Sequence, residues 1–395
     1  MELILPNEQQ LAAIDKGVDW FKKHKKQVFE IAGFAGTGKT TLARWILEAC
    51  GISVNEGLYV AFVGKAAMVL SMRGLPARTI HSTIYECIDV PKRDKSGNII
   101  YVDGMMLTDK KFIKKKSLPD EIKVIIVDEG SMVDDKLFRD LKSFGKPIIV
   151  LGDLHQLPPV FGRSGCLQHP DVVLTQIMRQ AEGNPIIHFA TMAREKRWDA
   201  FKYGSYGNRV FIIPQEQVLK HHDMIKNSDV IICGYNRTRE ELNNYIREEV
   251  YHMPKNDIAI GEKLICRENN WNRKLTDNVF LINGMIGYVQ DIDYESFNKR
   301  TLDIDFRPEF IKDKCFMGIP MDWKYLNMNY LDKRLYQSPY DKFEFGYAIT
   351  CHLAQGSQYD NVLLIVENLR RGDDYFSQHL YTGISRAVSK LIIAI

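Results

Sequence analysis

The sequence lacks a long apolar run, and this absence excludes a membrane-spanning helix. Such a helix needs about 18 or more consecutive apolar residues, and the 395 residues contain no such stretch. The first ten residues, MELILPNEQQ, have neither the basic start nor the long apolar core of a secretory signal, so we expect no signal peptide. We therefore expect a protein of the cytoplasm.

The chain lacks a regular cysteine pattern and a large excess of charge of either sign. The seven cysteines are scattered, odd in number and nowhere spaced as CxxC. This pattern excludes a disulfide framework and a zinc site of the usual spacing, and it indicates a reducing compartment. The 53 basic and 50 acidic residues give a net charge of +3, which by itself identifies no partner.

What the chain does have is a globular composition and enough length for two or three domains. Hydrophobic residues make up 45% of the sequence, which is normal for a protein with a sizeable core. No repeat of fixed period and no low-complexity tract is present. Function must therefore be sought in individual motifs.

The strongest motif is GFAGTGKT at residues 33–40, which fits GxxxxGK[ST] between an expected strand (28–32) and an expected helix. Such a loop cradles phosphates with backbone N–H groups, and the helix N-terminus adds the positive end of its dipole. A lysine at this position reaches the β- and γ-phosphates, and the following threonine can ligate Mg²⁺. The sequence thus predicts a site for ATP and Mg²⁺, formed by Gly36, Thr37, Gly38, Lys39, Thr40 and Thr41.

Two further strands are expected to end in polar loops. The run 124–128 ends in Asp128 and Glu129, which we interpret as a metal-holding acid and the base that activates water. A pair that only caps a helix is the alternative. The run 147–151 leads into a proline-stiffened loop that carries Gln156, interpreted as a sensor of the γ-phosphate, with a simple turn as the alternative. In a parallel α/β sheet all these strand ends meet at one edge.

In its motifs and their order the chain resembles superfamily 1 helicases, specifically the RecD/Dda-like branch that moves 5′ to 3′ on single-stranded DNA. LPNEQQLAAI (5–14) is similar to the adenine-reading Q motif, FVGKAAMVLS (62–71) to motif Ia, and ARTIHS (77–82) to the next DNA-contacting motif. VDEGS resembles motif II, with Gly130 in place of the usual alanine. Motifs III to VI are matched by GDLHQLPPV, LTQIMRQ (174–180), FGYAITCHLAQGSQYD (345–360) and LYTGISRA (380–387).

The resemblance implies roles for residues that local pattern alone would not single out. Nucleotide binding would extend to Gln10 and Gly356, and Arg179 and Arg386 would stabilise charge on the transferring phosphoryl group. Contacts to DNA would come from Lys65, Thr79, His81, Thr350 and His352. For the two histidines, a buried and hydrogen-bonded role is the alternative.

The resemblance also implies an α/β fold with two RecA-like parallel-sheet motor domains, a hairpin insert and a small β-barrel insert. We expect residues 1–84 plus 121–180 to form the first motor domain and 181–258 plus 338–395 the second. The hairpin, or pin, would occupy 85–120, with a turn near Ser96 and Gly97, and the barrel 259–337. The apparent tip of the hairpin is polar, which leaves its strand-separating residue unidentified.

The function implied is that of an ATP-dependent DNA helicase, acting as a monomer on single-stranded and tailed duplex DNA in a bacterial or phage-infected cell. Replication or recombination proteins are possible partners. Two alternatives remain: a P-loop phosphotransferase or kinase, and a DNA-binding motor subunit of a larger recombination nuclease complex. The first would not account for residues 345–360 and 380–387, and complete motor positions argue against a subunit without activity.

Overall fold

The computed structural model describes residues 5–159, 164–176, 183–254, 257–276, 279–298 and 300–395. The chain divides into two compact units. The first comprises Met1–Glu86, Phe112–Lys196 and Ser377–Thr382, and the second comprises Cys87–Lys111, Arg197–Phe376 and Gly383–Ile395.

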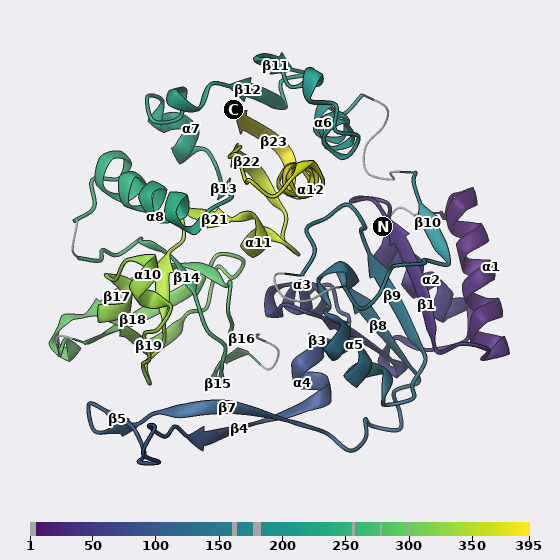
Figure 1. The fold of residues 1–395 in the computed structure, drawn as a ribbon, viewed down its shortest axis with the longest axis horizontal. Helices are drawn as coiled ribbons and strands as arrows, with labels where there is room; N and C mark the ends of the chain where they lie inside the picture. Colours follow the sequence, from purple (N-terminus) through teal and green to yellow (C-terminus); the bar gives the residue numbers. More distant parts are fainter. Residues whose placement is uncertain (1–4, 160–163, 177–182, 255–256, 277–278, 299) are drawn as a thin grey trace. The chain divides into compact units, whose positions relative to one another are not determined.

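A six-stranded sheet forms the centre of the first unit (Figure 1), and every pairing in it is parallel. Its order is β10 (Val172–Leu174), β1 (Val28–Gly33), β9 (Ile148–Gly152), β8 (Val124–Asp128), β2 (Gly57–Ala61) and β3 (Ala77–Thr79). The expected strands 28–32, 124–128 and 147–151 are therefore confirmed as central neighbours. Their carboxyl ends lie at the same edge because the strands run in one direction.

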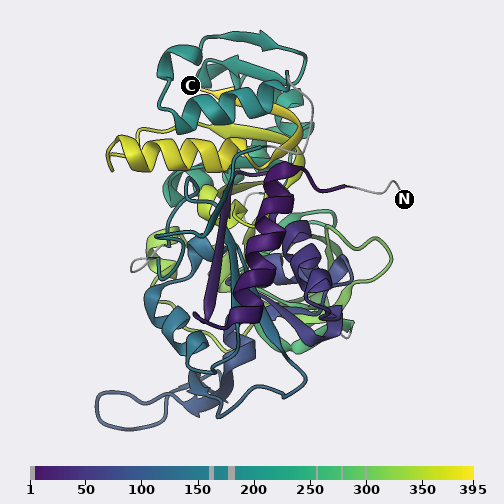
Figure 2. The ribbon, with the colours of Figure 1, turned by 90° about the vertical axis from the view of Figure 1, so that its right-hand side faces the viewer.

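Helices cover both faces of this sheet. On one face, α1 (Glu8–Lys23) and α2 (Lys39–Ala49) lie side by side (Figures 1 and 2). The other helices are α3 (Gly64–Met72), α4 (Ile80–Ile84), α5 (Asp135–Lys142) and α6 (Pro185–Arg194). Two-sided burial requires strands that are apolar at nearly every position, and the burial of β2 and β9 at all five positions fits this requirement.

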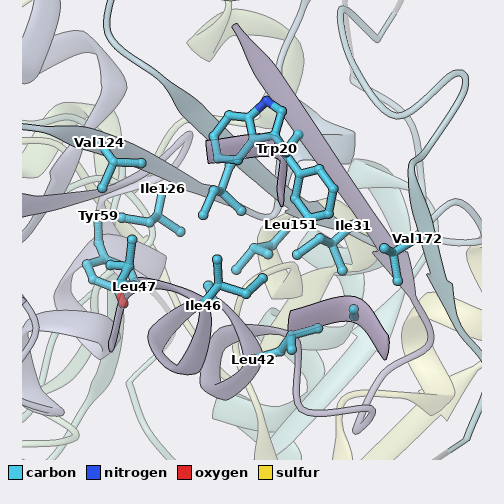
Figure 3. Packing of buried hydrophobic residues seen from close by; sticks show 14 of the residues in the cluster. Trp20, Ile31, Leu42, Ile46, Leu47, Tyr59, Val124, Ile126, Leu151 and Val172 are labelled. Carbon is cyan, nitrogen blue, oxygen red and sulfur yellow. The ribbon is translucent and has the colours of Figure 1, made fainter. Parts of the chain in front are cut away.

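Successive residues of each strand enter different cores, because side chains alternate across a strand. The core beneath α1 and α2 is shown in Figure 3 and includes Trp20, Ile31, Leu42, Ile46, Leu47, Tyr59, Val124, Ile126, Leu151 and Val172. The core on the opposite face includes Ala32, Val60, Ile80, Ile84, Ile125, Val127, Leu137, Phe138, Ile148 and Val150. The sheet is thus held rigidly from both sides, which fixes the positions of its loop ends.

The second unit contains a comparable six-stranded sheet. Its order is β11 (Gly204–Tyr206), β12 (Val210–Ile213), β23 (Ala387–Ala394), β22 (Tyr359–Ile365), β13 (Val230–Cys233) and β21 (Ala348–Thr350). All pairings except that of the edge strand β11 are parallel. The helices of this region are α7 (His222–Lys226), α8 (Asn236–Tyr245) with a π-helical continuation (Ile246–Val250), α11 (Cys351–Ala354) and α12 (Asp373–Ile384). The part of α12 from Ser377 to Thr382 belongs to the first unit. The expectation of two α/β sheets is confirmed.

An antiparallel sheet of five strands forms the second insert. Its order is β19 (Phe316–Asp322), β18 (Thr301–Pro308), β17 (Ile286–Asp293), β14 (Lys263–Cys266) and β20 (Phe343–Phe345). A bridge joins Met321 of β19 to Asp341, two residues before β20, so the two outer strands come close to each other at this end of the sheet. The sheet extends beyond the expected segment 259–337, because β20 pairs with β14.

The hairpin insert is built on β4 (Tyr85–Pro91) and β7 (Thr108–Lys114), which form a two-stranded sheet (Figure 1). The expected turn near Gly97 is present, with φ of 87° at that glycine and the Asp94 carboxylate accepting from two backbone N–H groups. A second turn, at Asp103 and Gly104, joins the short strands β5 (Tyr101–Val102) and β6 (Met105–Met106). Sequence reasoning missed this turn, although Asp-Gly is a strong hairpin signal.

Packing requires Gly130, at the position where the motif resemblance leads us to expect alanine. A Cβ built on it would lie 2.5 Å from Cγ1 of Val150 and 3.2 Å from the carbonyl oxygen of Leu151. The loop after β8 therefore lies directly against β9, at a distance that only glycine permits. Packing, rather than backbone conformation, requires the glycine here.

We expect Gly130→Ala to lower the free energy of unfolding by about 1–3 kcal/mol, the usual cost of overpacking a core. Ser131→Ala is the matched control, since the buried Ser131 hydroxyl has no hydrogen-bond partner within the described residues and its removal should be about neutral. Urea denaturation of both variants measures the difference. Equal stability of Gly130→Ala and wild type would contradict the packing argument.

Candidate active site

The phosphate loop lies between β1 and α2 in the first unit. Gly36 and Gly38 have φ angles of 81° and 77°, a backbone conformation that glycine adopts without strain. A Cβ at Gly38 would also lie 2.9 Å from Nε2 of Gln10. The loop can therefore turn its N–H groups toward an anion at the start of α2.

Lys39 and Thr37 fix the shape of this loop through its carbonyl groups. The Lys39 ammonium donates to the carbonyl oxygens of Gly33, at 2.8 Å, and Phe34, at 3.0 Å. The Thr37 hydroxyl donates to the Phe34 carbonyl at 2.9 Å and is buried. Thr41, further along α2, is exposed. The cationic end of Lys39 thus lies beside the loop, where a phosphate group can attract it.

Gln10 contacts the phosphate loop directly. Its Nε2 donates to the carbonyl of Thr37 at 3.1 Å, and its Oε1 accepts from the backbone N–H of Asn7 at 3.0 Å. The Asn7 side chain accepts from Gln10 N in return, which makes a capping box at the start of α1. Gln10 is 1% exposed, so the amide holds α1 and the phosphate loop in a fixed relation.

Asp128 and Thr40 form the set of oxygen ligands that Mg²⁺ would need. The Thr40 hydroxyl is hydrogen-bonded to the Asp128 carboxylate. Burial raises the pKa of Asp128 above its ordinary value, while the nearby Lys39 charge opposes the shift. A partly buried carboxylate of this kind gains from a cation beside it. Hard oxygen donors with one acidic group fit the chemistry of Mg²⁺.

Glu129 follows Asp128 in a backbone conformation that is costly for a residue with a side chain. Its φ and ψ are 51° and 44°, in the left-handed region, which costs about 1–2 kcal/mol for a non-glycine residue. The backbone N–H of Glu129 donates to Asp128 Oδ1 at 3.0 Å. Strain of this kind persists where the surrounding structure enforces it, and it is common at functional sites.

The loop after β9 is organised by Asp153. This side chain is fully buried, and its Oδ1 accepts from the backbone N–H of His155 at 3.0 Å. The Asp153 carbonyl accepts from Gln156 N at 3.3 Å. Gln156 is also buried, and its Oε1 has no hydrogen-bond partner among the residues described. The loop thus presents a buried amide with unused hydrogen-bonding capacity.

These contacts bring together, in one unit, most of the residues that the sequence predicts for nucleotide binding. Gly356, with φ of 73°, and Arg386 belong to the second unit. Arg386 is buried there and donates to the Ser357 carbonyl at 3.1 Å and to the Ser385 hydroxyl at 2.9 Å. Arg179 lies outside the described residues.

The DNA-contact candidates of the first unit lie on or next to two short helices. Lys65 is half-buried in the first turn of α3. Thr79 caps α4 by accepting from Ser82 N at 3.1 Å, so its hydroxyl already has a structural role. His81 lies in an aromatic cluster with Phe62, Tyr85 and Phe112.

Burial lowers the pKa of both candidate histidines, His81 and His352, so each is uncharged near neutral pH. His352 follows Thr350, the buried residue that precedes α11, and its ring is 6.5 Å from that of Tyr375. Their contacts to nucleic acid would therefore be those of a neutral ring. The contacts of both histidines to DNA stay predictions.

Sequence reasoning missed one feature in each unit: an exposed apolar group in the second unit and a buried hydrogen-bonded pair in the first. Tyr101, Met105 and Met106, around the second hairpin turn, are exposed apolar side chains, and the Asp-Gly pair between them was the signal. Tyr381 and Asp153 are both buried and share a hydrogen bond of 2.6 Å. No local pattern could reveal that pair, because 228 positions separate its members.

Two parts of the chain match models of known protein families. Residues 18–162 match the family model described as AAA domain, and residues 345–394 match the UvrD-like helicase C-terminal domain. The chain is 25% identical over 430 residues to the ATP-dependent DNA helicase dda of Enterobacteria phage T4, covering 92% of this chain and 93% of that protein. It is 21% identical over 410 residues to the ATP-dependent DNA helicase Pif1 of Campylobacter jejuni, and the match covers 91% of this chain and 86% of that protein.

Solved structures show the same fold. The Bacteroides Pif1 helicase in complex with ADP-AlF3 and single-stranded DNA superimposes with a TM-score of 0.56 at 17% identity, covering 99% of this chain and 92% of that one. At this identity the likeness concerns the fold alone. Among the described helices, none combines the length and apolar content needed to cross a membrane.

Two substitutions separate nucleotide binding from hydrolysis. Lys39→Ala should abolish most ATP binding, because the ammonium meets the β- and γ-phosphates. Glu129→Gln should bind ATP normally but hydrolyse it about 10²- to 10⁴-fold more slowly, the usual effect of losing a general base. A fluorescent ATP analogue measures binding, and phosphate release measures turnover. Near wild-type turnover in Glu129→Gln would remove that residue from the role of base.

Proposed function

We infer that this chain, which belongs to the Dda/Pif1/RecD-like group of superfamily 1 helicases, is an ATP-dependent DNA helicase. It translocates 5′ to 3′ on single-stranded DNA and unwinds duplex DNA. The observation that carries this proposal is the grouping of the phosphate loop, the acid pair and the Gln156 loop at the ends of β1, β8 and β9. The match to related helicases along nearly the whole chain supports it.

Each residue of the site has a proposed task. Gly36, Thr37, Gly38, Lys39 and Thr41 bind the phosphates of ATP, and Thr40 and Asp128 hold Mg²⁺, which neutralises phosphate charge when it is bound. Glu129 takes the proton of the attacking water, and Gln156 senses the γ-phosphate. Gln10, whose Nε2 keeps a second hydrogen, contacts the adenine. Gly356 also binds nucleotide, and Arg179 and Arg386 stabilise the transition state.

DNA is held without strong sequence preference, by phosphate contacts and by stacking. We assign these contacts to Lys65, Thr79, His81, Thr350 and His352. The first motor domain is proposed as 1–84 plus 121–180, the second as 181–258 plus 338–395, with the pin at 85–120 and the barrel insert at 259–337. The protein works as a monomer, in the cytoplasm of a bacterial or phage-infected cell, where replication or recombination proteins would be its partners.

The tip of the hairpin is proposed to separate the strands. Tyr101 is 59% exposed, and Met105 and Met106 lie beside it, so the end of this polar hairpin is apolar. Asp103, in the turn, forms an ion pair of 3.1 Å with Arg300, the residue that precedes β18. An aromatic ring held in this way can stack on the last base pair of a duplex.

A P-loop kinase remains the rival function, and one experiment separates it from the helicase. ATP hydrolysis is measured with and without single-stranded DNA, next to unwinding of duplexes with a 5′ or a 3′ tail. We expect hydrolysis to rise with DNA. An equal rate of ATP hydrolysis with and without single-stranded DNA, together with transfer of phosphate to another acceptor, would favour the kinase.

The polarity experiment gives a separate prediction. A duplex with a 5′ single-stranded tail should be unwound, and a duplex of the same sequence with a 3′ tail should not, because the resemblance to the RecD/Dda-like branch implies movement from 5′ to 3′. A blunt duplex is the control. Unwinding only from the 3′ tail would overturn the assigned branch and leave the ATP-driven motor intact.

Tyr101→Ala should slow strand separation by about fivefold or more, since stacking on a base contributes about 1–3 kcal/mol. ATP hydrolysis stimulated by single-stranded DNA should stay near the wild-type level, because the tip acts only on duplex. Tyr203→Ala is the matched control, as Tyr203 is similarly exposed, at 62%, and lies in the same unit. Equal unwinding by the two variants would argue against Tyr101 as the separating residue.

A further inference from the structure

The hydroxyl of Tyr381 lies between two loops of the first unit. It donates to Asp153 Oδ2 at 2.6 Å and accepts from the backbone N–H of Ala35 at 3.0 Å. Tyr381 is 2% exposed and Asp153 is fully buried. A phenol can donate one hydrogen bond and accept others, and here both capacities are used between residues far apart in the sequence.

The two loops joined in this way are those that matter for hydrolysis. Ala35 belongs to the phosphate loop, whose carbonyls hold the Lys39 ammonium. Asp153 shapes the other loop, because its carboxylate and its carbonyl accept from the N–H groups of His155 and Gln156. One hydroxyl therefore completes a chain of hydrogen bonds from the phosphate loop to Gln156.

Neighbouring contacts hold this hydroxyl in place. Thr382, the next residue, accepts through its hydroxyl from the buried N–H of Leu157 at 3.0 Å. The His155 ring lies between those of Phe34 and Tyr381, with centroid distances of 5.7 and 6.2 Å. The same two loops are thus joined by ring packing as well as by hydrogen bonds, and the geometry leaves Tyr381 little freedom to move.

We propose that Tyr381 is a positioning residue for ATP hydrolysis, which fixes the Gln156 loop relative to the phosphate loop. This inference rests on the proposed helicase function. The hydroxyl of Tyr381 holds the two loops through Asp153 and the Ala35 N–H, so we expect it to affect the relative position of the loops more than nucleotide binding. Its loss would leave the Asp153 carboxylate and the Ala35 N–H without their shared partner in a buried place, and the loops would shift apart to recover partners.

The test is Tyr381→Phe, measured by steady-state ATP hydrolysis in the presence of single-stranded DNA. We expect kcat to fall by about tenfold or more, whereas KM for ATP and the affinity for a fluorescent ATP analogue change by less than about threefold; a tenfold loss corresponds to ~1.4 kcal/mol. A residue that only stabilised the fold would not separate kcat from KM in this way. A rise in KM for ATP as large as the fall in kcat would make Tyr381 a part of the binding pocket and would overturn the proposal.

Tyr59→Phe is the matched control. The Tyr59 hydroxyl is fully buried in the same unit and has no hydrogen-bond partner within the described part of the chain. Its removal should leave hydrolysis unchanged. Thermal unfolding of both variants reports on folding, and a similar loss of kcat in Tyr59→Phe would mean that any buried hydroxyl has this effect, which would overturn the proposal.

A second variant, Asp153→Asn, keeps the test decisive if Tyr381→Phe is poorly folded. The amide retains an acceptor for the His155 N–H but no longer offers a carboxylate to Tyr381. The two substitutions are then combined in one chain. If Tyr381 and Asp153 act through their shared hydrogen bond, this double variant should lose no more kcat than the worse single variant, whereas independent effects would give the product of the two losses. Multiplied losses would overturn the inference. A wild-type chain without DNA-stimulated hydrolysis would instead overturn the proposed function.

Discussion

The parallel register of β1, β9 and β8 is the constraint on which the rest of the first unit depends. Ala32 pairs with Gly152, and Val127 pairs with Val150, so the three strands end at nearly the same level. A phosphate loop, an acid pair and a glutamine loop follow them. The two cores on the faces of the sheet are buried almost completely, which makes this edge a rigid base for groups that must be placed accurately.

Much of this arrangement could be predicted from sequence, because it depends on local patterns. The phosphate loop at 33–40 has its own glycine spacing, and the runs 124–128 and 148–152 are apolar enough to be recognised as buried strands. Their meeting at one edge follows from the geometry of parallel sheets. The order of the motifs then gave the resemblance to superfamily 1 helicases, and the fold is similar to that of the Bacteroides Pif1 helicase.

The features that could not be predicted depend on contacts distant in the sequence. Gly130 could be recognised as a departure from the family pattern, but its cause is the side chain of Val150 on the next strand. Gln10 was expected to meet a nucleotide, yet its bond to Thr37 was not foreseeable from a motif. The apolar hairpin tip was missed for a different reason: the insert contains two turns, near Gly97 and at Asp103 and Gly104, and local sequence does not show which of them carries the exposed tip.

The contact between Gly130 and Val150 has a consequence for how this sequence can change. Because a Cβ at position 130 and the Cγ1 of position 150 would occupy the same space, the two positions are not independent. A related chain that carries alanine at the first must carry a smaller side chain at the second, or separate β8 from β9 near the acid pair. Alanine at position 130 therefore costs stability unless position 150 also changes to a smaller side chain.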